Sequence, residues 1–234
     1  MIASFHLVHY RDRRFVQSRR AARNVAGLRF WRPLGIGPDW GALPADFNRW
    51  TLARPDFKRW SFFGVWEDEA ALEGFLAESA LARKWREAAK EVWHVRLKPV
   101  RTQGTWRGLK PLEGLEPEEL PQAPVAVLTR VEIRARKVPT FWLSMTRVAA
   151  ADIRKAPGLL AGLAMVERPY FEAMTFTLWQ SRDDAMNFAY KRPAHVGLTE
   201  RSRSEKVASF FSAHFYPYRS EGTWYGRDPL SQSS

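Results

Sequence analysis

The sequence predicts an α+β protein in which two duplicated ferredoxin-like units close a pseudo-dimeric α/β barrel within one chain. Two observations support this: an internal repeat, and the same order of elements in both copies. Three blocks recur collinearly, namely Arg54-Pro55-x-Phe57 with Arg168-Pro169-x-Phe171, Phe63-x-x-Trp66 with Phe176-x-x-Trp179, and Gly104-Thr105-Trp106-x-Gly108-x-x-Pro111-Leu112 with Gly222-Thr223-Trp224-x-Gly226-x-x-Pro229-Leu230. An ordered set of matches indicates a duplication rather than chance.

Hydrophobic periodicity gives each copy the order β-α-β-β-α-β, which is that of a ferredoxin-like unit. In the first copy we expect a strand, a basic helix, two strands, helices and a strand, at 3–10, 12–25, 28–31, 60–66, 67–92 and 94–102. In the second copy the corresponding elements are expected at 124–134, 138–155, 160–168, 173–179, 181–208 and 210–219. The predicted organisation is therefore a first repeat at 1–112, a proline-rich linker at 113–123 and a second repeat at 124–234.

A ferredoxin-like unit has helices on one face of its sheet and leaves the other face bare. Two such units can bury their bare faces against each other, which closes a barrel. The chain supplies 11 Trp and 15 Phe, which are bulky enough to fill its interior.

Composition excludes several kinds of site. The 234 residues contain no cysteine, so disulfides, Cys-ligated zinc, iron–sulfur clusters and thiolate-ligated haem are absent. No apolar run is long enough for a membrane-spanning helix, and we expect a cytoplasmic protein. The net charge of +12 favours an anionic partner, either an anionic cofactor or an anionic membrane surface, although solvated helix faces explain it equally well. Nucleic acid is disfavoured because no zinc-finger or RNA-recognition signature accompanies the charge.

A candidate functional residue emerges from the difference between the copies. The second copy is longer between Trp179 and Gly222 than the first is between Trp66 and Gly104, and this stretch contains Phe188-Ala-Tyr-Lys-Arg-Pro-Ala-His195. The first copy has no histidine there. His195 is therefore a candidate metal ligand, although a lone histidine is more often an ordinary surface or core residue.

The other histidines suggest no site. His6 and His9 are three apart on a strand and should point to opposite faces, and we expect His94 and His214 at helix-to-strand junctions. The spacing of two histidines and a carboxylate, the His-Glu-x-x-His motif and the Gly-x-Ser-x-Gly motif are all missing.

The chain also resembles a known family. The strings Phe30-Trp31-Arg32-Pro33-Leu34-Gly35-x-Gly37, Pro124-Val-Ala-Val-Leu-Thr-Arg130, Thr175-Phe-x-Leu-Trp179, Phe188-Ala-Tyr190-x4-His195 and Gly222-x-Trp224-x-Gly226 resemble the spheroidene monooxygenase family of carotenoid-modifying enzymes. The match is scattered over nearly the whole chain.

This resemblance implies a dimeric α/β-barrel fold, haem b with His195 as the axial iron ligand, and insertion of oxygen from O₂ into an acyclic carotenoid. It also implies an external electron donor. With no cysteine available, imidazole is the ordinary haem ligand. Arg192 and Arg201 are candidates for pairing with the haem propionates, and Tyr190 for packing on the haem edge; solvent exposure and ordinary core packing are the respective alternatives.

A second feature of the first copy is the long connection at 32–55, which carries Trp40, Phe47 and Trp50. Such loops are commonly lids or binding loops, and aromatic side chains suit an apolar polyene. Trp31 and Arg32 lead into it and are our candidates for catalytic residues on the distal side of the haem. A structural loop that caps the barrel is the alternative.

Three other functions remain compatible with the sequence. One is a haem-dependent lyase or dehydratase of the aldoxime type, in which substrate nitrogen binds iron. Another is a non-catalytic haem-binding or basic interaction module. The third is a cofactor-free barrel oxygenase, in which His195 has no role in the chemistry.

Overall fold

The computed structural model describes residues 1–12, 22, 24–39, 56–119, 121–144, 153, 156–168, 170–191 and 207–231. Its strands form one closed barrel in the order β1-β3-β2-β6-β7-β5-β8-β4, with every neighbouring pair antiparallel. Each half of this order is the sheet of one ferredoxin-like unit, so the predicted fold class is confirmed.

The elements of the N-terminal unit are β1 (Ile2–Tyr10), β2 (Leu28–Asp39), β3 (Asp56–Trp66), α1 (Glu69–Glu78), α2 (Ala80–Ala88) and β4 (Ala89–Gly104). Those of the C-terminal unit are β5 (Val125–Ile133), the 3₁₀ helix η2 (Ala135–Lys137), α3 (Val138–Ser144), β6 (Leu159–Val166), β7 (Glu172–Trp179), α5 (Arg182–Lys191) and β8 (Val207–Gly222). The equivalent positions Asp68 and Ser181 cap α1 and α5, because their side chains accept hydrogen bonds from Ala71 N and Asp184 N.

Strands β4 and β8 are longer than predicted, and each begins where a helix was expected to continue. The reason is tertiary. The two strands pair with each other from Trp93–Gly222 to Gly104–Phe211, which closes one seam of the barrel, and their first residues pair with β1 (Tyr10–Ala89 to Val8–Val92) and β5 (Ile133–Val207 to Val131–Phe210). This pairing overrides the local helical periodicity. As a result His94 and His214 lie inside strands, and their predicted place at junctions was wrong.

The predicted connection at 32–55 was wrong at its start, because β2 continues from Leu28 to Asp39 through pairing with β3 and β6; residues 40–55 lie outside the described residues.

Two predicted helices also fall largely outside the described residues. These are the basic helix at 12–25 and the later part of the helix at 138–155. The tail of the helices at 181–208 overlaps β8, which starts at Val207.

The repeated Gly-Thr-Trp motif has a structural role at the two ends of the barrel. Gly104 and Gly222 have φ of +80° and +83°, and a Cβ at either would lie 2.1 Å from the carbonyl oxygen of Phe210 or Val92. The next residue in each motif donates its backbone N–H to that same carbonyl, at 2.8 and 3.0 Å. Each unit's closing motif therefore crosses onto the last strand of the other unit, and only glycine fits the crossing.

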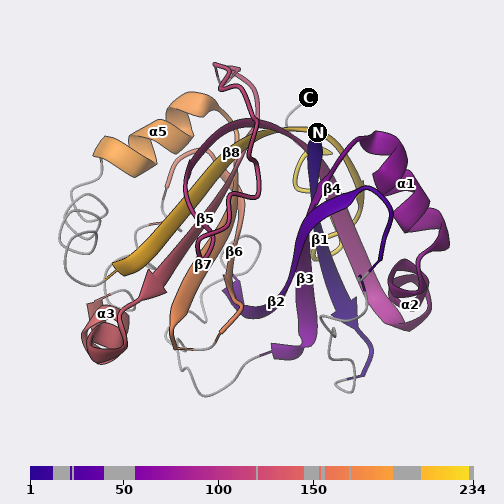
Figure 1. The fold of residues 1–234 in the computed structure, drawn as a ribbon, viewed down its shortest axis with the longest axis horizontal. Helices are drawn as coiled ribbons and strands as arrows, with labels where there is room; N and C mark the ends of the chain where they lie inside the picture. The colour runs from indigo at the N-terminus through magenta and orange to yellow at the C-terminus, as the bar shows by residue number, and fades with distance from the viewer. Residues whose placement is uncertain are drawn as a thin grey trace.

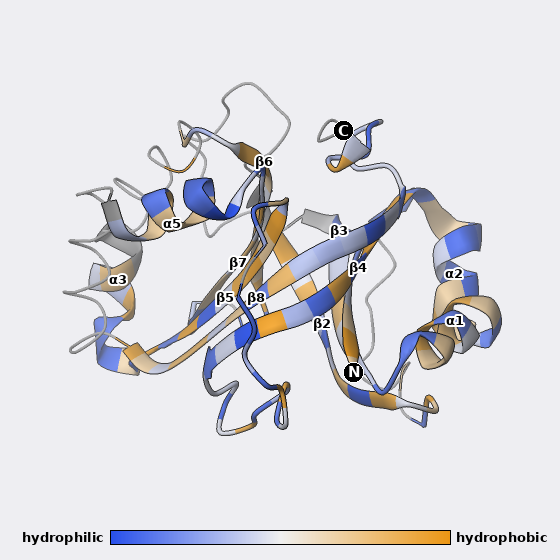
Figure 2. Ribbon diagram, turned by 90° about the horizontal axis from the view of Figure 1, so that it is seen from above, coloured by the Kyte–Doolittle hydropathy of each residue, from blue (hydrophilic) through white to orange (hydrophobic). Residues whose placement is uncertain are grey.

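Side chains fill the barrel interior. The largest apolar cluster takes residues from all eight strands, and Phe5 and Phe176 stack inside it with ring centroids 4.0 Å apart. Two further layers lie outside the barrel, where α1 and α2 cover one sheet and α3 and α5 cover the other (Figures 1 and 2). Among the described helices, none has the length and apolar character needed to cross a bilayer.

Candidate functional site

The strands of the two units pair in equivalent registers, so each position on the sheet of one unit has a counterpart on the sheet of the other. We call the outer face of β1–β4 the N-terminal face and the outer face of β5–β8 the C-terminal face. The central row of the N-terminal face consists of Pro33, Phe62, His6 and His94. Its counterpart on the C-terminal face consists of Ala164, Thr175, Thr129 and Ser212.

Aromatic rings fill the N-terminal face. Phe62 and His6 are fully buried. The His6 ring lies 5.6 Å from Phe62 and 5.3 Å from His94, centroid to centroid, and Phe75 of α1 and Trp85 of α2 pack against both Phe62 and His6. Among the described residues, these rings therefore cover the centre of the N-terminal face.

A short network links some of the polar atoms of the N-terminal face, while His6 Nδ1, Trp85 Nε1 and His94 Nε2 are buried without a hydrogen-bond partner in the described part of the chain. Ser4 Oγ accepts a hydrogen bond from Trp66 Nε1 at 2.8 Å and lies 2.8 Å from His6 Nε2. Burial lowers the pKa of His6 well below its usual value, helped by the positive charge of Arg96, so His6 is neutral at pH 7.

The C-terminal face carries small side chains at the same positions. Thr129, Thr175 and Ser212 are only half-buried although they occupy the middle of the sheet. Helix α5 packs at one end of this face through Phe188, and α3 packs at the other end through Phe141. The row between them presents hydroxyl and methyl groups where the N-terminal face has two imidazoles and a phenyl ring. These residues fit a flat, largely apolar group such as a haem.

His214 lies on the next row of the C-terminal face. That row is formed by Gly162, Thr177, Val127 and His214, and the equivalent row of the N-terminal face has Trp31, Gly64, Ser4 and Arg96. Burial lowers the pKa of His214, as does the charge of Arg101. Its Nδ1 is buried and has no hydrogen-bond partner in the structure. Sequence reasoning missed this residue, although the alternation of apolar Phe211, Ala213 and Phe215 could have shown which way it points.

Of the predicted cofactor residues, only Tyr190 belongs to the described part of the chain. Its side chain is on the outer side of α5 and is 64% exposed, whereas Ala185 and Phe188 of the same helix are buried. His195, Arg192 and Arg201 lie outside the described residues, just after α5. Within the described ranges there is no cluster of three or more metal-ligating His, Asp or Glu side chains.

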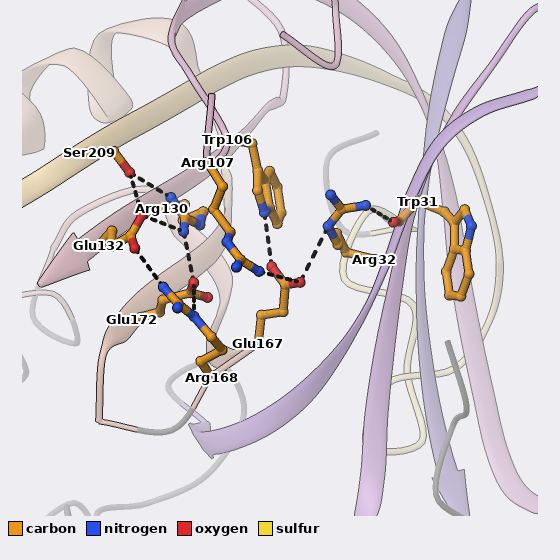
Figure 3. Close-up of polar contacts among 10 residues, drawn as sticks. All are labelled: Trp31, Arg32, Trp106, Arg107, Arg130, Glu132, Glu167, Arg168, Glu172 and Ser209. Carbon is orange, nitrogen blue, oxygen red and sulfur yellow. Dashed lines mark hydrogen bonds and ion pairs between the residues drawn. The ribbon is translucent and has the colours of Figure 1, made fainter. Parts of the chain in front are cut away.

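The structure does not bring the two predicted catalytic residues together. Adjacent residues on a strand point to opposite faces, and Trp31 stacks on Phe62 of the N-terminal face, centroids 5.7 Å apart. Arg32 instead points toward Glu167 at one end of the barrel (Figure 3). Its guanidinium carbon also lies 4.2 Å from the centre of the Phe30 ring.

Glu167 joins the two units at this end of the barrel. Its side chain is 1% exposed and accepts a hydrogen bond from Trp106 Nε1 at 3.0 Å. It forms ion pairs with Arg32 Nε at 3.4 Å and with an Arg107 guanidinium nitrogen at 3.7 Å. Figure 3 shows its carboxylate between these groups, with the Trp31 indole turned away.

A second set of charges fills the same end, which we call the C-terminal mouth. Arg130 is fully buried and donates to Glu172 at 2.8 Å, to Ser209 at 3.1 Å and to Glu132 at 3.3 Å. Arg168 also bonds both carboxylates, at 2.6 and 3.0 Å. Burial by itself would raise the pKa of Glu132, but hydrogen bonds from Ser209, Arg168 and Arg130 outweigh it and hold that pKa below its ordinary value. Because the charges are paired with one another, this mouth is a structural seal.

Comparison with known proteins gives consistent results across nearly the whole chain. It is 32% identical to a spheroidene monooxygenase of Rubrivivax gelatinosus over 214 residues, which cover 92% of this chain and 78% of that one. It is 26% identical to a spheroidene monooxygenase of Rhodobacter capsulatus over 218 residues, covering 92% and 86%. No protein-family model matches. Among solved structures, an anthrone oxidase-like protein aligns over 94% of this chain and 92% of its own, with 11% identity and a TM-score of 0.35.

Proposed function

The chain belongs to the spheroidene monooxygenase family, and from this premise we propose that it is a haem-dependent monooxygenase acting on an apolar substrate such as an acyclic carotenoid. One oxygen atom of O₂ enters a C–H bond of the substrate as a hydroxyl group, and the other leaves as water, which takes two electrons from an external donor and two protons from solvent. The haem supplies the activation of O₂ when it is bound. An anionic membrane surface, from which an apolar substrate could be delivered, is part of the same proposal.

The observation that carries this proposal is the contrast between the two outer faces. A haem needs a flat site next to an imidazole, and the C-terminal face has small residues where its counterpart is filled. The segment with His195 continues from α5, which packs on this same face. His195 is the proposed axial ligand, with Arg192 and Arg201 pairing with the propionates and Tyr190 at the edge.

The described residues of this face contribute to the proposed haem site in two ways. Thr129, Thr175 and Ser212 offer hydroxyl groups along the row, while Val127 and Ala164 keep its floor apolar. A mostly apolar pocket with a few polar groups binds and orients an apolar ligand and excludes water from it.

Hemin titration tests the ligand assignment. The wild-type chain is expected to show a Soret band that saturates at one hemin per chain, and His195→Ala is expected to lose it. The matched control is His9→Ala, which removes a half-buried histidine of the other unit and should leave the band unchanged.

A second variant keeps the test informative. If His214→Ala, and not His195→Ala, removes the band, the ligand lies on β8 and the assignment is wrong. Hemin binding unaffected in both variants would contradict a haem on the C-terminal face.

The reaction class is tested separately with labelled oxygen. Product formed from an acyclic carotenoid under ¹⁸O₂, with a chemical reductant, is expected to carry the label. Turnover that proceeds without O₂ would instead favour the lyase alternative.

A further inference from the structure

The edge of the C-terminal mouth exposes side chains that neither the seal nor the proposed haem site uses. Three segments form this edge, which we call the rim, namely 106–110, 133–138 and 167–172. Glu167 joins the first segment to the third, because it accepts the hydrogen bond from Trp106 Nε1 at 3.0 Å. The backbone N–H of Ile133 joins the second to the third, because it donates to the carbonyl of Phe171 at 2.8 Å. The rim is therefore one continuous part of the surface.

Large apolar side chains are exposed on the rim. Leu109 is 50% exposed, Tyr170 46% and Phe171 43%. Among the residues that the structure describes, only two other large hydrophobic side chains are exposed, Tyr190 on α5 and Tyr218 on β8. Exposed apolar groups that gather in one region mark an interaction site, whereas scattered ones need no explanation.

The exposed charges of the rim are positive. Lys110, Arg134 and Arg136 are exposed. The acidic residues of the three segments are Glu167 and Glu172, whose side chains are 1% and 0% exposed and already form ion pairs with arginines. A partner that approaches the rim therefore meets apolar groups and positive charge, which attract an anionic surface with an apolar interior.

The equivalent end of the other unit does not repeat this combination. In the repeated Gly-Thr-Trp motif, Leu109 corresponds to Arg227, which is exposed. Two residues after the end of β1 the chain has an exposed Asp12, and two residues after the end of β5 it has Ala135. An apolar side chain is thus replaced by a charge and a carboxylate is added, so the duplication alone does not account for the rim.

The rim also borders the outer face on which we propose the haem. Ile133 at the rim packs with Phe141 of α3, and Ala173 of β7 packs against these two. Ala173 lies two residues after Phe171 of the rim and two before Thr175 of the central row, and alternate residues of a strand lie on the same face. A molecule held at the rim is therefore next to the proposed site.

We propose that the rim docks the protein on an anionic lipid bilayer. Its exposed apolar side chains enter the interfacial region, where aromatic rings are favoured. Lys110, Arg134 and Arg136 lie close to the lipid phosphates, and each such charge strengthens binding about fivefold. The inference rests on the proposed function for the apolar substrate that the bilayer delivers, whereas the docking itself needs neither haem nor substrate.

Vesicle co-sedimentation of the full chain without hemin tests this inference at physiological ionic strength. Vesicles of phosphatidylcholine mixed with phosphatidylserine are expected to bind the chain at least about tenfold more tightly than phosphatidylcholine alone. Arg134→Gln combined with Arg136→Gln is expected to weaken binding to the mixed vesicles about tenfold or more. Leu109→Ser combined with Phe171→Ser is expected to weaken it about fivefold, because the apolar area that enters the bilayer is lost.

The matched control is Arg83→Gln with Lys84→Gln. It removes two exposed positive charges from α2, which lies on the opposite side of the barrel from α3 and the rim (Figure 1). Binding to the mixed vesicles should stay within about twofold of the wild type, because charges more than a Debye length from the lipid are screened.

Several results would overturn the inference: no binding to the mixed vesicles, equal binding to both kinds of vesicle, an equal loss in the α2 variant, or tighter binding to duplex DNA than to mixed vesicles at equal phosphate concentration. If one pair of rim substitutions prevents folding, as judged by circular dichroism, the other pair carries the test. Hemin titration of the rim variants is expected to match the wild type. A chain that binds the mixed vesicles but not hemin would keep the docking surface and contradict the proposed function, so the two failures are told apart.

Discussion

The N-terminal and C-terminal units have equivalent strands that pair in the same register. Their bulky side chains, however, occupy different places in the two units. The N-terminal unit packs its outer face with Phe62, His6 and His94 and has Leu7 at the position equivalent to Arg130. The C-terminal unit seals its mouth with Arg130 and has small residues on its outer face. After duplication, the strand pairing was kept in both copies, and the size and charge of a few side chains at equivalent positions differ.

The largest effect is expected from breaking the seal of the C-terminal mouth. Glu172→Gln removes the fully buried partner of a fully buried arginine, and losing one member of such a pair costs about 3 kcal/mol of unfolding free energy. Urea denaturation at pH 7 measures this. The control is Glu118→Gln, which breaks an exposed pair with Lys98 and should cost at most about 0.5 kcal/mol. Equal losses in the two variants would mean that the network does not hold this mouth together.

The next test introduces on the C-terminal face the bulky rings that the N-terminal face carries. Thr129→His combined with Thr175→Phe recreates the rings of the filled row, and we expect hemin affinity to fall about a hundredfold because the rings occupy the haem volume. Hemin titration by absorbance measures the change. Thr129→Ser with Thr175→Ser alters the same positions without adding volume and should bind hemin as the wild type does. Normal hemin binding by the ring-bearing variant would place the haem elsewhere.

A smaller effect concerns the dependence of stability on pH, to which the N-terminal face contributes two buried histidines, His6 and His94, and the C-terminal face one, His214. Burial lowers the pKa of His6 and of His94 in the folded chain, while unfolding restores both to about 6.5. The unfolded state therefore binds more protons, and stability falls as pH drops below 6.5, by up to about 1.4 kcal/mol per pH unit for each histidine. Urea midpoints between pH 7.5 and 5.5 measure this slope. His6→Gln is expected to flatten it, and an unchanged slope would exclude His6 as its source.

Much of this fold could be predicted from sequence because its evidence is local and repeated. The strings around Trp66 and Trp179, and the two Gly-Thr-Trp motifs, mark equivalent elements without any knowledge of tertiary contacts. The early start of β8 at Val207 could not be predicted in this way, because it is pairing with β5, from Ile133–Val207 to Val131–Phe210, that makes that segment a strand.

The candidate sites were harder to predict for a related reason. His195 can be identified from the sequence because it is present in one copy and absent in the other. The contrasts of Thr129 with His6 and of Leu7 with Arg130 are differences of size at equivalent register positions. They become visible only when the strand pairing aligns the two copies, and neither histidine nor charge patterns reveal them.

The smallest effect concerns Arg32, which the sequence presents as a catalytic residue and the structure places against Glu167. Arg32→Gln leaves Glu167 with the Trp106 indole and Arg107, so we expect a loss of about 1 kcal/mol in unfolding free energy and no change in hemin affinity. Urea denaturation and hemin titration of the same preparation measure both quantities. Arg107→Gln, which removes the other arginine from the same carboxylate, is the control and should cost a similar amount. If turnover per bound haem fell more than tenfold in Arg32→Gln alone, with stability unchanged, the interpretation as an interunit contact would be wrong. Arg32 would then act on the substrate, as its place before the long connection at 32–55 predicts.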